Sequence, residues 1–146
     1  MYGPHLILEG YDASKRKLSS VGHIYRTLDD YPALIGMTKI MPPHVQKHLT
    51  PGEPGWGVSG FVIIAESHIA IHTYPEIGFF ALDVFSCKDF DIEKAIRYAV
   101  KQFSLTQYDH KLLNRGEDYP KDIAESGAIV GADRRKFGKT AARGRL

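Results

Sequence analysis

The spacing of apolar residues predicts a chain built mainly of strands, with two helices among them. Short apolar runs predict strands over residues 5–11, 36–41, 58–65, 68–73, 79–86 and 105–114. Two segments instead repeat apolar residues every three or four positions, as amphipathic helices do. The first covers residues 15–30 and ends before Pro32, and the second begins after an N-cap at Asp89 or Asp91. The predicted buried faces hold Leu18, Val21, Tyr25 and Leu28 in the first helix, and Ile92, Ile96, Ala99 and Phe103 in the second.

The order of these elements predicts an α+β fold. Residues 42–57 contain seven Pro and Gly residues, so this stretch is expected to be mostly loop. Two helices beside several closely spaced strands favour a two-layer sandwich, with a largely antiparallel sheet and the helices on one face. We expect residues 1–116 to form this domain and residues 117–146 to be a peripheral or flexible basic tail. The other face of the sheet needs a cover, and a second copy of the chain is the simplest candidate.

Length and charge exclude several classes of protein. The chain has 146 residues, of which 43% are apolar, and a formal net charge of +2 at pH 7; these values are typical of a soluble domain. No apolar run approaches the roughly 20 residues that span a bilayer, and the first residues lack a basic signal region. We therefore expect a cytoplasmic protein without a membrane partner. The basic tail lacks an aromatic stacking platform, so we expect no nucleic-acid partner.

Reactive side chains concentrate in residues 57–87. In the simplest interpretation, these are strands whose polar residues face solvent. His68 and His72 would share one face of a strand and could bind zinc with Glu76 or His5. Nothing in the sequence fixes that geometry, so no metal site is predicted.

The chain has one cysteine, Cys87, which excludes an internal disulfide and a zinc site built on cysteines. Cys87 and His72 fall on neighbouring predicted strands and could form a nucleophile and its base. No third, orienting residue can be assigned from the sequence. On its own, a cysteine at a strand end is more often a small buried residue.

A long motif within this segment resembles one family. Residues 57–87 read GVSGFVIIAESHIAIHTYPEIGFFALDVFSC, and residues 4–12 read PHLILEGYD. Both stretches, the first almost position for position, resemble the prokaryotic S-adenosylmethionine decarboxylases, which are small pyruvoyl-dependent enzymes. The order of elements over residues 1–116 also fits that family. The resemblance implies a decarboxylase that converts S-adenosylmethionine to CO2 and its decarboxylated form, the aminopropyl donor of spermidine biosynthesis.

The resemblance implies that the chain is a proenzyme that cuts itself between Glu66 and Ser67. Ser67 would attack the preceding carbonyl, and elimination would then convert it into an N-terminal pyruvoyl group, the covalent cofactor. His72 would remove the α-proton of Ser67 in that elimination, and Ser59 would assist processing. Strict alternation places Ser67 and His72 on opposite faces of a strand, so their meeting requires a kink at Glu66–Ser67 or a rearrangement.

The resemblance also implies the residues that act on the substrate. The pyruvoyl ketone would form a Schiff base with the substrate amine and accept the electrons that decarboxylation leaves on the α-carbon. Cys87 would return a proton to that carbon, and Glu76 would hold the ribose hydroxyls. Trp56 could stack on the adenine, although it is not at the usual spacing. The working unit would be a homodimer of cleaved chains with sites at or near the interface.

Two alternatives remain open at this point. Some relatives decarboxylate arginine or ornithine, and Glu53, Glu76 and Asp12 could bind the distal cation of such a substrate. A non-catalytic binding or regulatory homologue is the second alternative. It predicts the loss of Ser67, His72 or Cys87, and all three are present.

Overall fold

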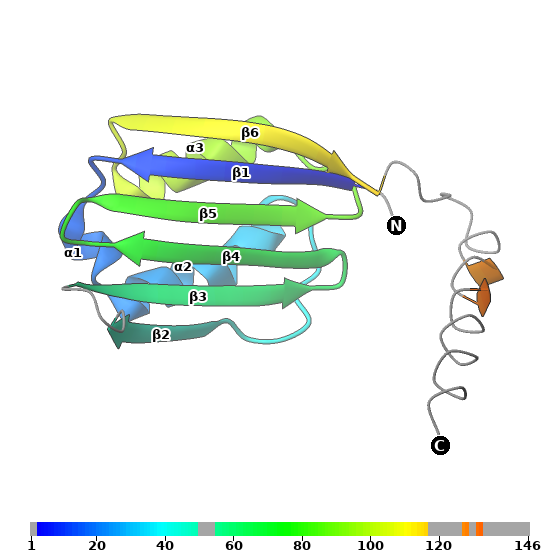
Figure 1. Cartoon of the computed structure of the whole chain (residues 1–146), viewed down its shortest axis with the longest axis horizontal. Helices are drawn as coiled ribbons and strands as arrows, with labels where there is room; N and C mark the ends of the chain where they lie inside the picture. Colours follow the sequence, from blue (N-terminus) through cyan, green and yellow to red (C-terminus); the bar gives the residue numbers. More distant parts are fainter. Residues whose placement is uncertain (1–2, 50–54, 117–126, 129–130, 133–146) are drawn as a thin grey trace, which may run out of the picture.

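The computed structural model describes residues 3–49, 55–116, 127–128 and 131–132. Its strands form one six-stranded sheet, and the helices pack against one face of that sheet (Figure 1). The elements are β1 (Gly3–Tyr11), α1 (Lys15–Leu18), α2 (Val21–Leu34), β2 (His44–Leu49), β3 (Trp56–Ile64), β4 (Ser67–Tyr74), β5 (Phe79–Ser86), α3 (Ile92–Phe103) and β6 (Gln107–Arg115). The strand order is β2-β3-β4-β5-β1-β6, and every neighbouring pair is antiparallel. The predicted α+β sandwich is confirmed.

Alternation along the strands gives the sheet two different faces. The helix-covered face carries the core, in which Val58, Val62, Ile69, Ile71, Leu82 and Val84 are at most 1% exposed. The helices add Ile24, Leu28, Ile96, Ala99 and Phe103 to the same core. The Tyr31 hydroxyl of α2 donates to the carbonyl oxygen of Ala95 in α3 over 2.6 Å, and burial raises the pKa of Tyr31, so it stays a neutral donor. No helix among the described residues 3–49 and 55–116 covers the opposite face (Figure 1), and we call it the open face.

The second predicted helix is confirmed as α3. Asp91 is its N-cap, and the Asp91 carboxylate accepts a hydrogen bond from the Lys94 backbone N–H over 2.9 Å. Ile96, Ala99 and Phe103 are buried as expected, whereas Ile92 at the first position is only partly buried.

The first predicted helix is wrong in its continuity and its end, and of its four expected buried residues only Leu18 and Leu28 are buried. Residues 15–30 do not form one helix, because α1 ends at Leu18 and α2 begins anew after the Ser20 side chain accepts a hydrogen bond from the His23 N–H. The restart rotates the buried face, so Val21 and Tyr25 are each 39% exposed. Pro32 lies inside the last turn of α2, where the loss of one backbone hydrogen bond does not end the helix.

One predicted strand is misplaced. Residues 36–41 form only an isolated bridge between Lys39 and Ile64. The strand at this edge of the sheet is β2, which lies in the stretch expected to be mostly loop and pairs with β3 from His44 opposite Phe61 to Leu49 opposite Trp56. The sequence did not predict this strand because prolines flank it on both sides. The strand can still form, since an edge strand needs a pairing partner on one side only and tolerates prolines at its ends.

The predicted tail from residue 117 lies almost wholly outside the described residues, so its character stays a prediction. In the part of the chain that the structure describes, no helix has the length and apolar character that crossing a membrane requires.

Candidate active site on the open face

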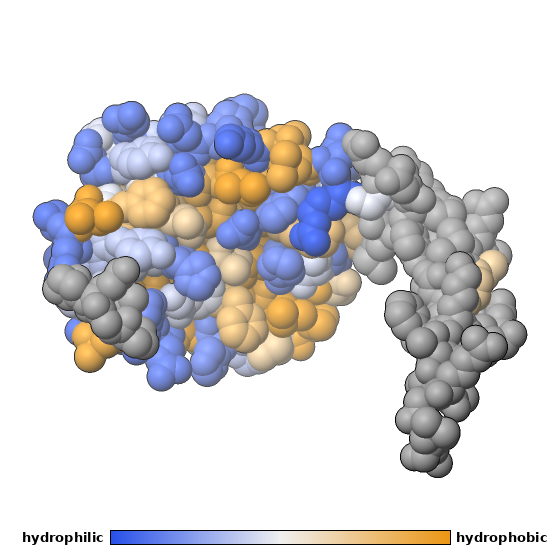
Figure 2. All heavy atoms as spheres, in the orientation of Figure 1, coloured by the Kyte–Doolittle hydropathy of each residue, from blue (hydrophilic) through white to orange (hydrophobic). Residues whose placement is uncertain are grey.

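The open face carries Ser59 and His72 of the side chains that the sequence singles out for processing, together with His68 and His5. Strand register aligns them in rows across the sheet, one row joining Ser59, His72 and Ala81, and another joining His68, Phe85 and His5. Figure 2 looks onto this face and shows polar groups mixed with apolar ones, the latter more extensive toward the right. The two rows lie toward opposite ends of the strands and form two separate groups.

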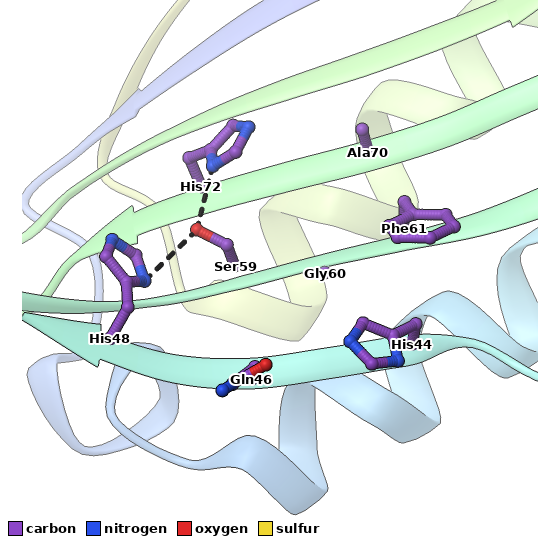
Figure 3. Close-up of a pocket in the computed structure, with 8 residues that line it drawn as sticks. All are labelled: His44, Gln46, His48, Ser59, Gly60, Phe61, Ala70 and His72. Atoms are coloured by element: carbon purple, nitrogen blue, oxygen red, sulfur yellow. Dashed lines mark hydrogen bonds between the residues drawn. The ribbon is translucent and has the colours of Figure 1, made fainter.

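The first group, which we call the pocket end, consists of His48, Ser59 and His72. Ser59 Oγ lies 2.8 Å from His72 Nδ1 and 3.4 Å from His48 Nδ1 (Figure 3). These side chains border an open hollow of about 440 Å³. Its lining residues are His44, Gln46, His48, Ser59, Gly60, Phe61, Ala70 and His72.

The β3–β4 hairpin explains why Ser59 and His72 meet. The two residues are directly paired across the strands, and their side chains therefore share the open face. The sequence predicted a shared processing role for them, and the structure brings them into contact. It did not predict His48, because β2 was expected to be loop. The alternating polar residues His44, Gln46 and His48 were the signal that could have identified this strand.

The second group, which we call the hairpin end, consists of Glu66, Ser67, His68 and Cys87. Glu66 lies in the tight turn between β3 and β4, and Ser67 is the first residue of β4. The Cys87 backbone N–H donates to the Glu66 carbonyl oxygen over 3.0 Å. Ser67 Oγ lies 3.1 Å from His68 Nδ1. The predicted scissile carbonyl thus already accepts a hydrogen bond, and the predicted nucleophile has an imidazole beside it.

Aromatic and charged groups surround His68. Its ring meets Phe85 edge-on with centroids 5.9 Å apart, and Arg115 lies 4.1 Å from the centre of the same Phe85 ring. His5 Nε2 and Asp83 Oδ1 are 3.0 Å apart nearby. Burial lowers the pKa of His68, and the neighbouring His5 and Arg115 lower it further, while Asp83 opposes them.

Within one chain the two groups do not meet. Ser67 and His72 are five positions apart on β4, and about 3.3 Å per residue separates them by about 16 Å. Ser67 is also paired with Ile64 and Ser86, which are buried on the helix side. No kink in β4 brings the predicted nucleophile to His72.

The same strand geometry bears on metal binding. His68 and His72 lie on one face but four positions apart, which is about 13 Å along a strand. Across residues 3–49 and 55–116, no group of three His, Cys, Asp or Glu side chains could hold a metal ion.

Glu76 and Trp56 both lie near the pocket end. Glu76 is exposed in the turn after β4, where its backbone oxygen accepts a hydrogen bond from Lys15 Nζ over 2.8 Å. Its carboxylate points toward residue 55, since a Cβ on Gly55 would lie 3.6 Å from Glu76 Oε2. The Trp56 ring packs against the core with Lys47 Nζ 3.8 Å from its centre. Trp56 is therefore not among the residues that line the hollow.

Of the two further acidic residues that could bind a distal cation, the structure describes only Asp12. Asp12 is exposed in the turn after β1. Glu53 lies outside the described residues.

Comparisons with known proteins agree with one another. A family model described as S-adenosylmethionine decarboxylase matches residues 4–116. The chain is 34% identical over 115 residues to the S-adenosylmethionine decarboxylase proenzyme of Archaeoglobus fulgidus, covering 78% of this chain and 97% of that protein. It is 35% identical over 126 residues to the proenzyme of the same name from a Synechococcus species, covering 86% and 92%. The crystal structure of the adenosylmethionine decarboxylase from Aquifex aeolicus matches with a TM-score of 0.65 at 27% identity, covering 82% of this chain and 94% of that one.

Proposed function

The chain belongs to the S-adenosylmethionine decarboxylase family, and from that premise we propose that it is a self-cleaving proenzyme that decarboxylates S-adenosylmethionine. The observation that carries the proposal is the surroundings of the Glu66–Ser67 peptide bond. Its carbonyl oxygen accepts the Cys87 N–H, and the hydroxyl that would attack it belongs to the next residue. A backbone donor already on the carbonyl oxygen is placed to stabilise the negative charge that attack creates.

Cleavage would convert Ser67 into a pyruvoyl group, which supplies the ketone that withdraws electrons from the substrate α-carbon. The surroundings of Ser67 fit this group. Ser67 is the first residue of β4 and follows a tight turn, so it would be the first residue of the C-terminal fragment after cleavage. Cys87 follows the strand paired with Ser67, so its thiol can supply the proton that the α-carbon needs after CO2 leaves. The thiol is partly exposed, which allows a substrate to reach it.

We further propose that the working unit is a homodimer in which the pocket end of one chain meets the hairpin end of its partner. The elimination step needs a base at the Ser67 α-proton, and His72 of the same chain is about 16 Å away along β4. Two copies packed with their open faces together and their strands reversed would supply His72 and Ser59 to the partner. The open face carries partly exposed apolar residues suited to such packing, including Phe61, Tyr74 and Leu113.

Glu76 is proposed to hold the substrate ribose. An exposed carboxylate close to the pocket end can accept two hydroxyl hydrogen bonds, which an arginine or ornithine substrate would not provide. The curated relatives reported above carry the name S-adenosylmethionine decarboxylase proenzyme, which favours this substrate over the two amino acids. Ser67, His72 and Cys87 are all present, which disfavours a non-catalytic homologue. The product would serve spermidine synthesis in the cytoplasm.

The test is an intact-mass measurement followed by a substrate panel. We expect the 16.4 kDa chain to yield two fragments that break between Glu66 and Ser67, the larger one blocked at its first residue. We expect CO2 release from S-adenosylmethionine and none from arginine or ornithine. The Ser67→Ala variant is the matched control and should stay whole and inactive. A wild-type chain that stays whole and releases no CO2 would overturn the proposal, and release from arginine alone would move it to the alternative substrate.

A further inference from the structure

His68 stands beside the residue at which the chain is proposed to cut itself, and no role has yet been given to it. Its Nδ1 lies 3.1 Å from Ser67 Oγ, within hydrogen-bond distance. The other histidine proposed to act in processing, His72, lies five positions further along β4. The only imidazole in reach of the Ser67 hydroxyl among the described residues of the same chain is therefore that of His68.

Resting on the proposed function, we propose that His68 is a catalytic residue of chain cleavage, acting as the base that takes the Ser67 hydroxyl proton. The assignment separates two proton transfers that cleavage requires. His68 would serve the first, ester-forming step within its own chain. His72 would serve the second, eliminating step from the partner chain.

The first step balances as an acyl transfer with a returning proton. His68 Nδ1 accepts the Ser67 Oγ proton while Oγ bonds to the Glu66 carbonyl carbon, and the negative charge gathers on the oxygen held by the Cys87 N–H. The bond between the Glu66 carbonyl carbon and the Ser67 nitrogen then breaks. That nitrogen takes the proton from His68 and becomes a free amine, and an ester joins the two fragments. His68 ends the step neutral, as it began.

The surroundings of His68 suit a base that must be neutral before it acts. In the tautomer with its proton on Nε2, the free Nδ1 faces the hydroxyl. Phe85 packs edge-on against its ring, which limits access to water. The charged and titratable groups near it are His5 on β1, Asp83 on β5 and Arg115 on β6. Burial lowers the pKa of His68, and His5 and Arg115 lower it further against the opposing effect of Asp83, so the unprotonated form prevails at neutral pH.

The test follows cleavage of the full chain after cell-free synthesis, comparing wild type with His68→Asn. Asparagine retains a hydrogen-bond acceptor of similar reach but cannot hold a proton, so we expect cleavage to slow by about 100-fold or more. His5→Asn is the matched control, because His5 also packs against Phe85, with centroids 5.5 Å apart, but has no contact with Ser67. This control should cleave within about threefold of wild type, and thermal melting should confirm that both variants fold.

Hydroxylamine then identifies which step is lost, because it cleaves esters and leaves peptide bonds intact. His72→Ala should accumulate the ester and be cut by hydroxylamine, whereas His68→Asn should resist it. For wild type, the cleavage rate should rise with pH and level off below the ordinary histidine pKa of about 6.5. A His68→Asn chain that cleaves at the wild-type rate, or one that hydroxylamine cuts as readily as His72→Ala, would overturn the assignment. Neither result affects the proposed function, which fails only if wild type stays whole.

Discussion

The pocket end and the hairpin end lie on the same sheet but are built in different ways. The pocket end is made by contacts across strands, since Ser59 on β3 bonds to His72 on β4 and faces His48 on β2. The hairpin end is made by a turn. There the Ser67 hydroxyl lies within hydrogen-bond distance of the neighbouring His68 ring, and the Glu66 carbonyl oxygen accepts a hydrogen bond from the Cys87 N–H after β5. The pocket end therefore offers imidazole bases, His48 and His72, but no proposed nucleophile for backbone cleavage. The hairpin end offers the proposed nucleophile Ser67 with one base, His68, beside it. Because a strand rises about 3.3 Å per residue, the five positions from Ser67 to His72 hold the proposed nucleophile and the proposed base for elimination at opposite ends of β4.

Mixing two inactive chains gives the largest expected effect. Ser67→Ala and His72→Ala should each fail to complete cleavage when made alone. When the two are co-expressed, the Ser67→Ala chain still supplies an intact His72 to its partner. We expect the His72→Ala chain to be cut in the mixture and the Ser67→Ala chain to stay whole, which mass spectrometry distinguishes. If the mixture remains as inert as the separate chains, the two ends do not complement each other across a dimer.

Cys87 separates the roles of backbone and side chain at the hairpin end. Cys87→Ala removes the thiol but keeps the N–H that holds the Glu66 carbonyl oxygen. We expect cleavage to continue, while decarboxylation falls by about 10²- to 10⁴-fold because the α-carbon loses its proton donor. The measurement is CO2 release per cleaved chain. An equal loss in cleavage and decarboxylation would contradict this division.

A buried hydroxyl lies near each end, Thr73 near the pocket end and Ser86 near the hairpin end, and the two should contribute differently to the free energy of unfolding. Near the pocket end, Thr73 Oγ1 accepts from the Val58 N–H over 2.9 Å and lies 3.0 Å from the Leu18 carbonyl oxygen. Thr73→Val leaves these buried backbone groups unpaired, so we expect the free energy of unfolding to fall by about 1–3 kcal/mol. At the hairpin end, Ser86 Oγ bonds only within the turn, to Lys88, besides a contact to a methionine sulfur.

Ser86→Ala should therefore lower the free energy of unfolding by less than Thr73→Val does, by about 1 kcal/mol. The backbone groups that it leaves unpaired belong to Lys88, which is exposed, so water can reach them. Urea unfolding of the two variants tests the order. A larger loss for Ser86→Ala would show that the turn, rather than the strand pair, is the firmer of the two ends.

Acid gives the smallest expected effect. Burial lowers the pKa of His68 and of His23, so the unfolded chain binds protons more readily than the folded one below the ordinary histidine pKa of about 6.5. The stabilisation is complete above that pH and is lost as the pH falls through the lowered pKa values. We expect the urea midpoint to decline on acidification from pH 7.5 to 5.5, and the decline to be smaller in His68→Asn by less than about 1 kcal/mol in stability. An undiminished decline in His68→Asn would assign the effect to other groups.

The sequence predicted those features that short-range periodicity determines. The central strands and α3 follow from alternation and helical spacing, and Ser59 and His72 belong to a motif whose strands pair across a tight turn. The sequence did not predict β2, whose pairing depends on β3 and is masked by neighbouring prolines. It also did not predict that the helix ends at Leu18 and a new one begins after Ser20. The apolar residues of α1 and α2 are spaced in the sequence as they would be in one longer amphipathic helix.

The sequence predicted candidate site residues, but it did not predict that they separate into two groups at opposite ends of the sheet. The motif names Ser67, His72 and Cys87 without saying how far apart a straight strand holds them. The sequence marks His68 only as a possible metal ligand, because a hydrogen bond between adjacent side chains leaves no pattern in the sequence. Its hydrogen bond to Ser67 depends on side-chain rotamers, which only the structure provides.

The position of β1 has a consequence for what the proposed cut would do to the molecule. Breaking the chain after Glu66 assigns β1, β2 and β3 to one fragment and β4, β5 and β6 to the other. Yet β1 is inserted between β5 and β6, and β3 remains paired with β4. The strands of the two fragments are therefore interleaved in the sheet. Separating the fragments would require breaking the hydrogen bonds of three strand pairs, β3–β4, β1–β5 and β1–β6. The proposed cut would therefore break the covalent chain and leave the strand order and pairing of the sheet unchanged.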